Sequence, residues 1–324
     1  MNPIRVRVPA TSANLGPGFD VLGLALQIYN YVTLEESTSG KDEIIALGEG
    51  ARTLNEANFE TNIALQAAHA LRDFLNVPSV PLQLTLENEI PLARGLGSSS
   101  AARIGALVAT NAWAQNNFGH GAEGSTLLSL ATALEGHPDN VAPALLGGLV
   151  VSAVDHATEE ERVLSLRIPT SSFPRLVIFI PESELETKEA RAVLPDAVFR
   201  KDAIFNLARS SLLVGVLASG AWQNRPELLR AALHDKLHQE YRAALMPAYD
   251  CTVRAALDAG ALGVTLSGAG PSILAWLPAD KSTPATEVAL AMEEAAAGCE
   301  VFGKAHEVLV DFKGCVVVEN QTEP

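Results

Sequence analysis

The residues best suited to chemistry lie in a glycine- and serine-rich segment from Pro91 to Ala102. Gly95 and Gly97 can adopt backbone conformations that other residues avoid, and the amides after them can then point toward one position at the positive end of a following helix. The consecutive hydroxyls of Ser98 to Ser100 can cap that helix or reach a metal ion or a phosphate oxygen. This combination predicts a cradle for the phosphates of a nucleotide, although an ordinary strand, turn and helix cap uses similar residues.

The segment follows neither of two familiar nucleotide-binding patterns. It lacks the lysine and hydroxyl pair that completes a P-loop, and its glycines do not have the spacing of the dinucleotide fingerprint. Both of those folds are therefore disfavoured. The phosphate-binding interpretation gains its weight from three further polar or glycine-rich segments elsewhere in the chain.

A second segment follows the first predicted strand and runs from residue 9 to residue 25. Gly16, Pro17 and Gly18 force a turn, so the side chains of Asn14 and Asp20 can converge on one small polar ligand. A carboxylate in that place can hold an ammonium group. The alternative is that both side chains only stabilise the turn by bonding to their own backbone.

A third segment, from Glu135 to Pro143, places polar side chains in a turn after a predicted helix. Mg²⁺ prefers one or two carboxylates together with phosphate and water oxygens, so Glu135 opposite the hydroxyl of Ser98 predicts a magnesium site. His137 with Asp139 is instead compatible with zinc or with a general base, but no further histidine or cysteine lies at ligand spacing. A simple helix cap remains the third interpretation.

A fourth segment, from Leu266 to Ile273, links two apolar stretches through two glycines. Glycines leave no side chain between the backbone and whatever approaches it, so a close neighbour is expected here. That neighbour is the phosphate-binding segment, the substrate or simply another strand.

Composition limits the class of protein. The chain has 324 residues, of which 48% are hydrophobic and 19% charged, enough for two domains with a sizeable core. A formal net charge of -15 argues against nucleic-acid and anionic-membrane partners, because both require a basic surface. The longest apolar runs, 144–154 and 212–222, fall short of the roughly 18 residues of a membrane span. The N-terminus has no secretory signal pattern, which predicts a cytoplasmic protein, and the three widely spaced cysteines predict buried free thiols.

Periodicity predicts an α+β protein. The strands are expected at residues 4–8, 29–35, 82–87, 176–180, 263–267, 272–276 and 315–319. The helices are expected at residues 62–75, 99–115, 125–135, 203–220, 226–233, 246–259 and 285–298. A charged run at 156–162 indicates a hairpin or linker, so the domains are expected at 1–160 and 161–324.

Together the four segments resemble the GHMP kinase superfamily. The sequence from Pro91 to Ala102 is similar to its phosphate motif, and the N-terminal and C-terminal glycine segments are similar to its other two motifs, in the same order. The forms Ala13-Asn-Leu-Gly-Pro-Gly-Phe-Asp20 and His137-Pro-Asp-Asn-Val-Ala-Pro143 resemble those of the homoserine kinase family in particular. The resemblance implies an ATP-binding N-terminal domain of the ribosomal-protein-S5-like type and a ferredoxin-like C-terminal domain, with ATP and homoserine meeting between them.

The resemblance also implies the site residues. Those around homoserine are Asn14, Asp20, His137, Asn140, Thr187, Arg191 and Arg242. Those on the nucleotide side are Asn62, Pro91, Leu92, Ala93, Arg94, Gly95, Leu96, Gly97, Ser98, Ser99, Ser100 and Ala101, and those for Mg²⁺ are Ser98 and Glu135. Two arginines suit the carboxylate of an amino acid while Asp20 takes its amine. Ser100 stands where relatives commonly have alanine.

The implied activity is transfer of the γ-phosphoryl group of ATP to the side-chain hydroxyl of L-homoserine, a step of threonine biosynthesis, with ATP and Mg²⁺ as cofactors. The resemblance implies no dedicated base, so Asp20 binds the substrate and the proton passes to phosphate or solvent. The alternatives are another GHMP small-molecule kinase and a non-catalytic ATP-binding sensor. The expected partner is the small-molecule substrate, and a homodimer is compatible with the sequence.

Overall fold

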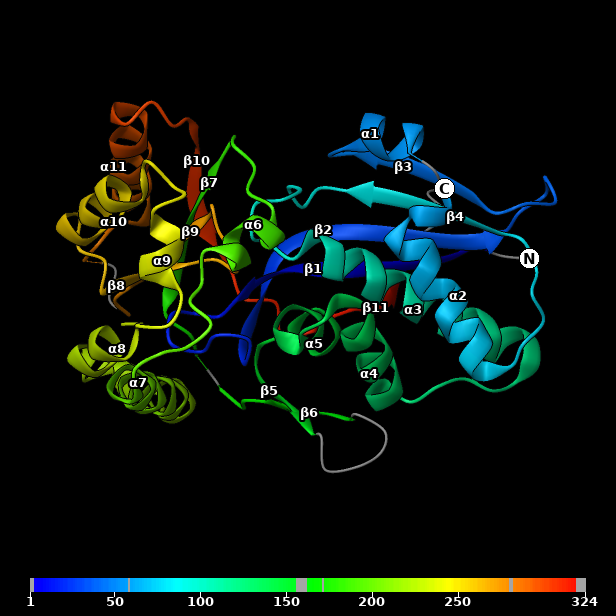
Figure 1. Cartoon of the computed structure of the whole chain (residues 1–324), viewed down its shortest axis with the longest axis horizontal. Helices are drawn as coiled ribbons and strands as arrows, with labels where there is room; N and C mark the ends of the chain where they lie inside the picture. Colours follow the sequence, from blue (N-terminus) through cyan, green and yellow to red (C-terminus); the bar gives the residue numbers. More distant parts are fainter. Residues whose placement is uncertain (1–2, 58, 156–161, 171, 280–281, 319–324) are drawn as a thin grey trace.

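The computed structural model describes residues 3–57, 59–155, 162–170, 172–279 and 282–318. Two β-sheets with their helices lie side by side along the long axis of the molecule (Figure 1). The sheet on the right of Figure 1 has seven strands in the described residues, and the sheet on the left has four. The predicted α+β class and two-domain architecture are confirmed.

The seven-stranded sheet is antiparallel except for the parallel pair β3 and β4. Its strands are β1 (Ile4–Ala13), β2 (Leu22–Glu36), β3 (Glu43–Gly48), β4 (Leu82–Asn88), β5 (Leu149–Asp155), β6 (Arg162–Arg167) and β11 (Val316–Val318). The helices of this part are α1 (Ala51–Glu56), η1 (Phe59–Thr61), α2 (Ile63–Leu75), α3 (Ser98–Phe118), α4 (Gly124–Glu135) and α5 (Pro138–Leu146).

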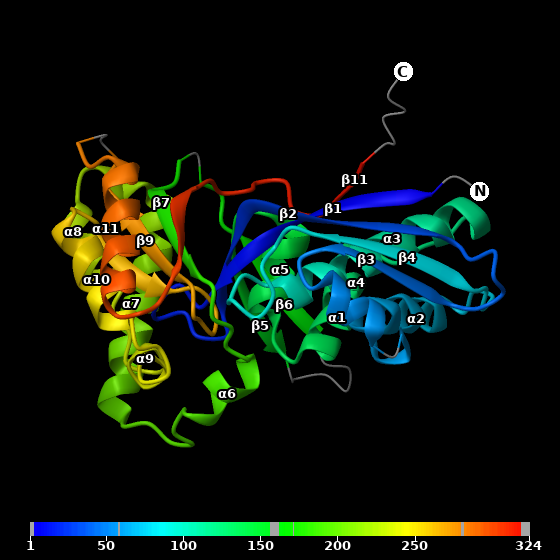
Figure 2. The ribbon, with the colours of Figure 1, turned by 90° about the horizontal axis from the view of Figure 1, so that it is seen from above.

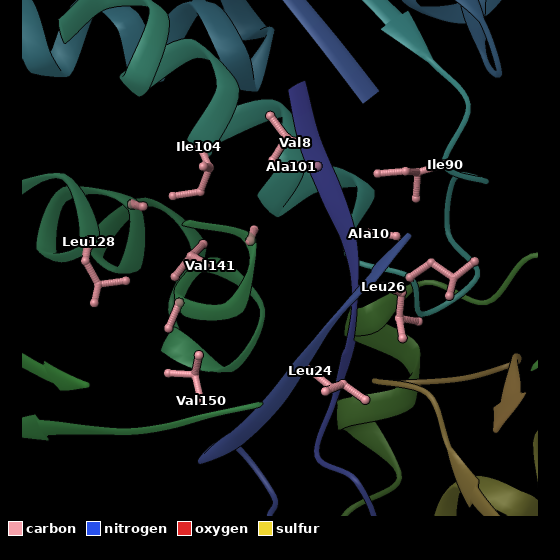
Figure 3. Packing of buried hydrophobic residues seen from close by; sticks show 14 of the residues in the cluster. Val8, Ala10, Leu24, Leu26, Ile90, Ala101, Ile104, Leu128, Val141 and Val150 are labelled. Carbon is pink, nitrogen blue, oxygen red and sulfur yellow. The ribbon is translucent and has the colours of Figure 1, made fainter. Parts of the chain in front are cut away.

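The core of this part lies between the sheet and its helices. β4 alternates buried and half-buried residues, which turns Leu82, Leu84 and Leu86 toward the core as the sequence pattern predicted. Figure 3 shows side chains of β1, β2, α3, α4 and α5 meeting in this layer. α3 lies so close to the sheet that a Cβ added at Gly105 would stand 2.5 Å from Cγ2 of Val32, so a larger residue at this position would push the helix away from the sheet.

The four-stranded sheet is antiparallel with the order β10-β7-β9-β8. Its strands are β7 (Arg175–Pro181), β8 (Gly263–Leu266), β9 (Ile273–Leu277) and β10 (Gly303–Val308). The helices of this part are α6 (Thr187–Ala192), α7 (Arg200–Ser219), η2 (Ala221–Gln223), α8 (Pro226–Ala232), α9 (Gln239–Ala243), α10 (Tyr249–Asp258) and α11 (Ala285–Gly298). A separate apolar cluster joins α10 and α11 to this sheet.

Three predictions of local structure were wrong. The strand expected at 29–35 begins already at Leu22. The strand expected at 4–8 continues to Ala13, because a register shift between Pro9 and Ala10 lets pairing with β2 resume beyond the proline. The polar turn expected after Glu135 is a single left-handed glycine followed by a helix, α5, with Pro138 in its first turn. Proline suits that position because the first amides of a helix have no partner within it.

The chain crosses between the two parts more than once. β11 returns to the first sheet beside β1, although it belongs to the C-terminal end of the chain. The predicted division after residue 160 falls in residues 156–161, which lie outside the described residues, and the strands on both sides of them pair with each other. The division therefore stays a prediction, and the first sheet includes strands from both sides of it.

Among the described residues, α7 is the one helix that is long and apolar enough to cross a membrane by length and composition. The three cysteines are free, as predicted, but each is half-buried rather than fully buried.

Candidate active site

A cavity of about 210 Å³ lies where loops of the two parts meet. Most residues that the sequence singled out line it. These are Asn14, Asp20, Asn62, the segment 91–99, Glu135, His137, Asn140, Thr187, Arg191 and Arg242. Ser100 and Ala101 do not, because both are fully buried in α3 and the amide of Ala101 already donates to the carbonyl of Gly97.

The phosphate segment reaches the cavity as a tight loop that ends at the N-terminus of α3. Gly95 and Gly97 have φ angles of 70° and 69°, which favour glycine. A Cβ on Gly97 would stand 1.9 Å from Oγ1 of Thr11, and one on Gly95 would stand 2.1 Å from the carbonyl oxygen of Ser267. Both glycines are therefore required by close packing, and no side chain among the described residues caps α3.

The neighbour of the C-terminal glycine segment is the phosphate loop. Ser267 donates its hydroxyl to the carbonyl of Gly95 at 2.7 Å, and a Cβ on Gly268 would stand 3.1 Å from the same carbonyl oxygen. The sequence left three possible neighbours open, namely the phosphate-binding segment, the substrate and another strand. This contact identifies the phosphate-binding segment as a neighbour. The two glycine-rich segments, about 170 residues apart, pack backbone to backbone.

Arg94 ties the same loop to the second part of the molecule. Its guanidinium donates to the carbonyls of Pro181 at 3.2 Å and Glu182 at 2.7 Å and pairs with Glu184 at 3.1 Å. The amide of Leu185 donates back to the carbonyl of Ala93. Arg94 thus acts as a tether, although the sequence placed it among the nucleotide contacts.

Glu135 lies beside the start of α3. Its carboxylate accepts from the hydroxyls of Ser99 at 2.6 Å and Ser100 at 2.9 Å, and it pairs with Arg103. The predicted partner, Ser98, makes no such bond, because the turn of the helix points the next two hydroxyls at Glu135 instead. Sequence reasoning missed Arg103, a cation one turn after Ser99, and its only signal was this i, i+4 spacing.

Oxygen atoms suitable for Mg²⁺ therefore surround Glu135. A carboxylate and hydroxyl groups are the hard donors that this ion prefers, and Ser98, Ser99 and Glu135 all line the cavity. The residues fit Mg²⁺, with the carboxylate of Glu135 shared between the ion and Arg103.

Another part of the cavity is built by the N-terminal turn. Asn14 and Asp20 have φ angles of 69° and 57°, and the amide of Asp20 donates to Oδ1 of Asn14 at 3.0 Å. Nδ2 of Asn14 donates to the carbonyl of Gly268 at 2.8 Å, which joins this turn to the C-terminal glycine segment. The turn is thus held from both sides, as a residue in left-handed conformation requires.

Asp20 forms a two-pronged ion pair with Arg191. The guanidinium nitrogens lie 3.0 Å and 2.7 Å from the two carboxylate oxygens, and both side chains are about one-third exposed. Together with His137 and Asp139, Asp20 offers ligand atoms within 4.8 Å of one another. Arg191 already engages Asp20, and Asp139 accepts a hydrogen bond from Nδ1 of His137, so the carboxylates have partners within the protein.

Arg242 is the most unusual charge in the cavity. It is 1% exposed, and no carboxylate among the described residues lies within ion-pair distance of it. Its nitrogens donate to the carbonyls of Ala190 and Gly268 and to Nδ1 of His238. Burial and the nearby charge of Arg191 lower its pKa to about 10, which still leaves it positive near neutral pH. A buried cation of this kind invites an anionic ligand.

A network that the sequence did not reveal holds Arg242. Asp235 accepts from the amides of Leu237, His238 and Gln239. The ring of His238 bonds through Nε2 to the carbonyl of Gly16 at 2.8 Å, so Nδ1 accepts from Arg242. Burial lowers the pKa of His238, which favours this neutral ring. The spacing from His238 to Arg242, one helical turn, was the only sequence signal.

The remaining predicted residues have simpler settings. Asn140 accepts from the hydroxyl of Thr11 at 2.7 Å, and Thr187 is an exposed residue at the start of α6. Asn62 caps α2, since its Oδ1 accepts from the amides of Ala64 and Leu65, and it also lines the cavity.

Comparison with known proteins agrees with this architecture. The family model described as GHMP kinases N terminal domain matches residues 62–148, and the one described as GHMP kinases C terminal matches residues 213–298. A homoserine kinase of Moorella thermoacetica is 47% identical over 84% of this chain and 86% of its own length. One of Desulfitobacterium hafniense is 41% identical over 97% of this chain and 100% of its own length.

Solved structures agree as well. The crystal structure of homoserine kinase from Cytophaga hutchinsonii has a TM-score of 0.85 and 28% identity, covering 98% of each chain. A mevalonate kinase structure has a TM-score of 0.61 at 15% identity over 95% of this chain and 99% of its own, which shows the shared fold alone. The two family models match, and these relatives are more than 40% identical over most of the chain, so this chain belongs to the homoserine kinase family of the GHMP kinases.

Proposed function

We propose that this ATP-dependent kinase transfers the γ-phosphoryl group of ATP to the side-chain hydroxyl of L-homoserine, giving O-phospho-L-homoserine and ADP. The observation that carries the proposal is Arg242, a buried cation without a carboxylate partner among the described residues, next to the pair of Asp20 and Arg191. An α-amino acid supplies the missing carboxylate together with an ammonium group. The names of the relatives support the same substrate.

The amino acid binds by joining an existing set of charges. Its carboxylate lies between the guanidinium groups of Arg191 and Arg242, which offer planar pairs of N–H donors. Its ammonium group shares Asp20 with Arg191. The side chain then points toward the phosphate loop, because Asn14 and Gly268 link this end of the cavity to the loop.

The phosphate end needs little covalent chemistry. Phosphoryl transfer passes through a loose transition state whose charge lies on the peripheral oxygens, so positioned donors do most of the work. The uncapped amides at the start of α3 and the positive end of its dipole supply them. We place Mg²⁺ on Glu135 with the hydroxyl of Ser98 nearby, where the bound ion neutralises charge on the phosphate oxygens.

Asp20 serves to bind and not to abstract the proton. Both of its oxygens accept hydrogen bonds from Arg191, so neither is free to take the proton of the substrate hydroxyl. The proton of the substrate hydroxyl therefore passes to phosphate or solvent. For Asp20→Asn we expect a higher KM for homoserine with kcat largely retained, and loss of kcat at unchanged KM would assign Asp20 the role of base.

The direct test measures ADP release from Mg-ATP with L-homoserine, D-homoserine, L-threonine, mevalonate and galactose, together with the product mass. Turnover confined to L-homoserine with a phosphorylated product establishes the activity. Turnover of another alcohol overturns the substrate, and ATP binding without turnover of any acceptor favours a sensor. We infer that the enzyme works in the cytoplasm, where ATP is available.

A further inference from the structure

Two arginines of the cavity lie over one aromatic ring, that of Phe19. Cζ of Arg242 lies 5.2 Å from the centre of this ring, and Cζ of Arg191 lies 5.6 Å from it. Both distances fall within the roughly 6 Å over which the negative face of a ring attracts a guanidinium group. Phe19 is half-buried and is not one of the residues that line the cavity. Its ring therefore contacts the arginines from behind and acts on a ligand only through them.

The ring and the two guanidinium groups come from three separate segments. Arg191 belongs to α6 and Arg242 to α9, and Figure 1 and Figure 2 both show these two helices next to each other. Phe19 belongs to the N-terminal turn and directly precedes Asp20, whose carboxylate pairs with Arg191. The ring thus connects the N-terminal turn with both helices that supply the cations.

The ring of Phe19 is itself held in place by His238. The two rings are stacked, with centres 5.2 Å apart and planes 25° apart. Nε2 of His238 bonds to the carbonyl of Gly16, in the same turn as Phe19, while Nδ1 accepts from Arg242. One histidine therefore fixes both the aromatic ring and one of the cations that lie over it.

Two guanidinium groups at such close range repel each other. Burial and the charge of Arg191 lower the pKa of Arg242, which records this repulsion. An aromatic face offsets part of it without adding a negative charge. A carboxylate in the place of the ring would instead neutralise the arginines and weaken their attraction for an anionic ligand. A phenyl ring holds the two cations together and leaves their charge available.

We propose that Phe19 is a positioning residue that fixes the spacing of the two guanidinium groups, so that the carboxylate of the acceptor fits between them. In this way the ring contributes to the preference of the site for an α-amino acid over an uncharged alcohol. The inference rests on the proposed function, in which Arg191 and Arg242 bind that carboxylate. Its effect should appear in the affinity for the acceptor, because the aromatic contacts of Phe19 are with His238 and the two arginines.

The first test compares Phe19→Leu with Phe19→Tyr by steady-state kinetics and by calorimetric titration with L-homoserine. Leucine removes both cation–π contacts, so KM and the dissociation constant for L-homoserine should rise by roughly 5-fold to 30-fold, with kcat and KM for ATP nearly unchanged. Tyrosine keeps the aromatic face and should retain most of the affinity. Unchanged KM in Phe19→Leu, or an equal loss in Phe19→Tyr, overturns the proposal.

Phe205→Leu is the matched control for this comparison. Phe205 is also half-buried, and Cζ of Arg209 lies 4.7 Å from the centre of its ring. Neither of these two residues lines the cavity. Loss of this cation–π contact should therefore leave KM for L-homoserine at the wild-type value, and a rise equal to that of Phe19→Leu would assign the effect to general loss of packing and overturn the proposal.

The second test keeps the shape of the ring and does not depend on the folding of the leucine variant. Residue 19 is replaced by mono-, di- and trifluorinated phenylalanine, in which fluorine withdraws negative charge from the face of the ring. KM for L-homoserine should rise stepwise with the number of fluorine atoms. A KM that is independent of fluorination would show that only the volume of Phe19 matters and would overturn the proposal.

The third test needs no acceptor and separates this proposal from the proposed function. NMR of the ligand-free protein measures the hydrogen exchange of the guanidinium protons of Arg191 and Arg242. Exchange should be faster in Phe19→Leu than in the wild type and unchanged in Phe19→Tyr. A wild-type protein that does not turn over L-homoserine overturns the proposed function, whereas exchange that is equal in the wild type and Phe19→Leu overturns the role of Phe19.

Discussion

The two ends of the cavity are built in different ways. The phosphate end is one continuous segment, and it works through its backbone: left-handed glycines, uncapped amides and a helix start. The acceptor end is assembled from the N-terminal turn, α5, α6, α9 and the C-terminal glycine segment, and it works through charged side chains. The phosphate end therefore depends on a local backbone conformation, whereas the acceptor end depends on contacts between distant parts of the folded chain.

This difference decides how each end tolerates change. A backbone cradle fails when a Cβ intrudes, and it is insensitive to the charge of distant side chains. An assembled charge pocket fails when one charge is removed, because its neighbours were positioned and desolvated around it. Substitutions at the two ends should therefore separate cleanly into effects on ATP and effects on the acceptor.

The largest effect is expected for Arg242→Gln. Truncating one side of a buried charge contact costs about 2–5 kcal/mol, so kcat/KM for homoserine should fall by roughly 30-fold to 4,000-fold while KM for ATP changes little. Steady-state kinetics with each substrate varied in turn measures both. Arg254→Gln, at an exposed position on α10, is the control and should behave as the wild type. An equal loss for both substrates would show that the two ends are not separable.

The substitution Gly95→Ala should disrupt ATP binding at the phosphate end. The new Cβ would meet the carbonyl oxygens of Ser267 and Gly270, which are backbone atoms and cannot move aside cheaply. We expect kcat/KM for ATP to fall by about 10²-fold, since a displacement of about 1 Å is enough for that loss. Gly124→Ala, where a Cβ meets nothing within 4 Å, should be neutral. Unchanged binding of ATP by Gly95→Ala, measured by calorimetry, would contradict the backbone description.

A smaller effect is expected for His238→Phe, which tests a positioning residue. Arg242 loses an acceptor, and hydrogen bonds to charged groups contribute about 1.5–3 kcal/mol, so KM for homoserine should rise by about 10-fold or more with kcat less affected. His238→Asn restores an acceptor near the position of Nδ1 and should recover much of the affinity. His234→Phe, at an exposed neighbouring position, is the control. A loss of stability without a change in KM, or no recovery by asparagine, would leave His238 a merely structural role.

The elements that the sequence predicted well are those with an unbroken pattern. β4 alternates along its whole length, and α2, α3 and α4 were placed to within a few residues. The extension of β1 beyond Pro9 was missed, because a proline ends most strands and only the pairing with β2 shows that this one continues. α5 was missed because polar residues at its start resemble a turn.

The site residues also fall into those that the sequence predicted and those that it did not. The loop from Pro91 to Ser99 could be predicted because its chemistry is local, and the family resemblance brought in Arg191 and Arg242. Neither pattern nor resemblance revealed Asp235, His238 or Arg103, since each acts through a contact made only in the folded chain. The hydrogen bonds from Ser99 and Ser100 to Glu135 depend on the rotation of α3, which a linear motif does not specify.

The smallest expected effect is a pH dependence of the free energy of unfolding, which arises from His137 at the acceptor end. Burial lowers the pKa of His137, but the hydrogen bond and charge of Asp139 outweigh burial and raise it above the ordinary value. The folded state therefore binds this proton more tightly than the unfolded state. The resulting stabilisation is complete below the unfolded pKa of about 6.5 and is lost as the pH rises through the higher pKa of the folded state.

The free energy of unfolding, measured with urea at several pH values, should therefore differ most between the wild type and His137→Gln on the acid side, and the difference should shrink as the pH rises. A difference that grows with pH would mean that the neutral ring is the form that Asp139 stabilises. The phosphate end holds its shape through backbone contacts, so we expect His137→Gln to leave the affinity for ATP unchanged over the same pH range. That result would assign the pH response of the stability to the side chains of the acceptor end.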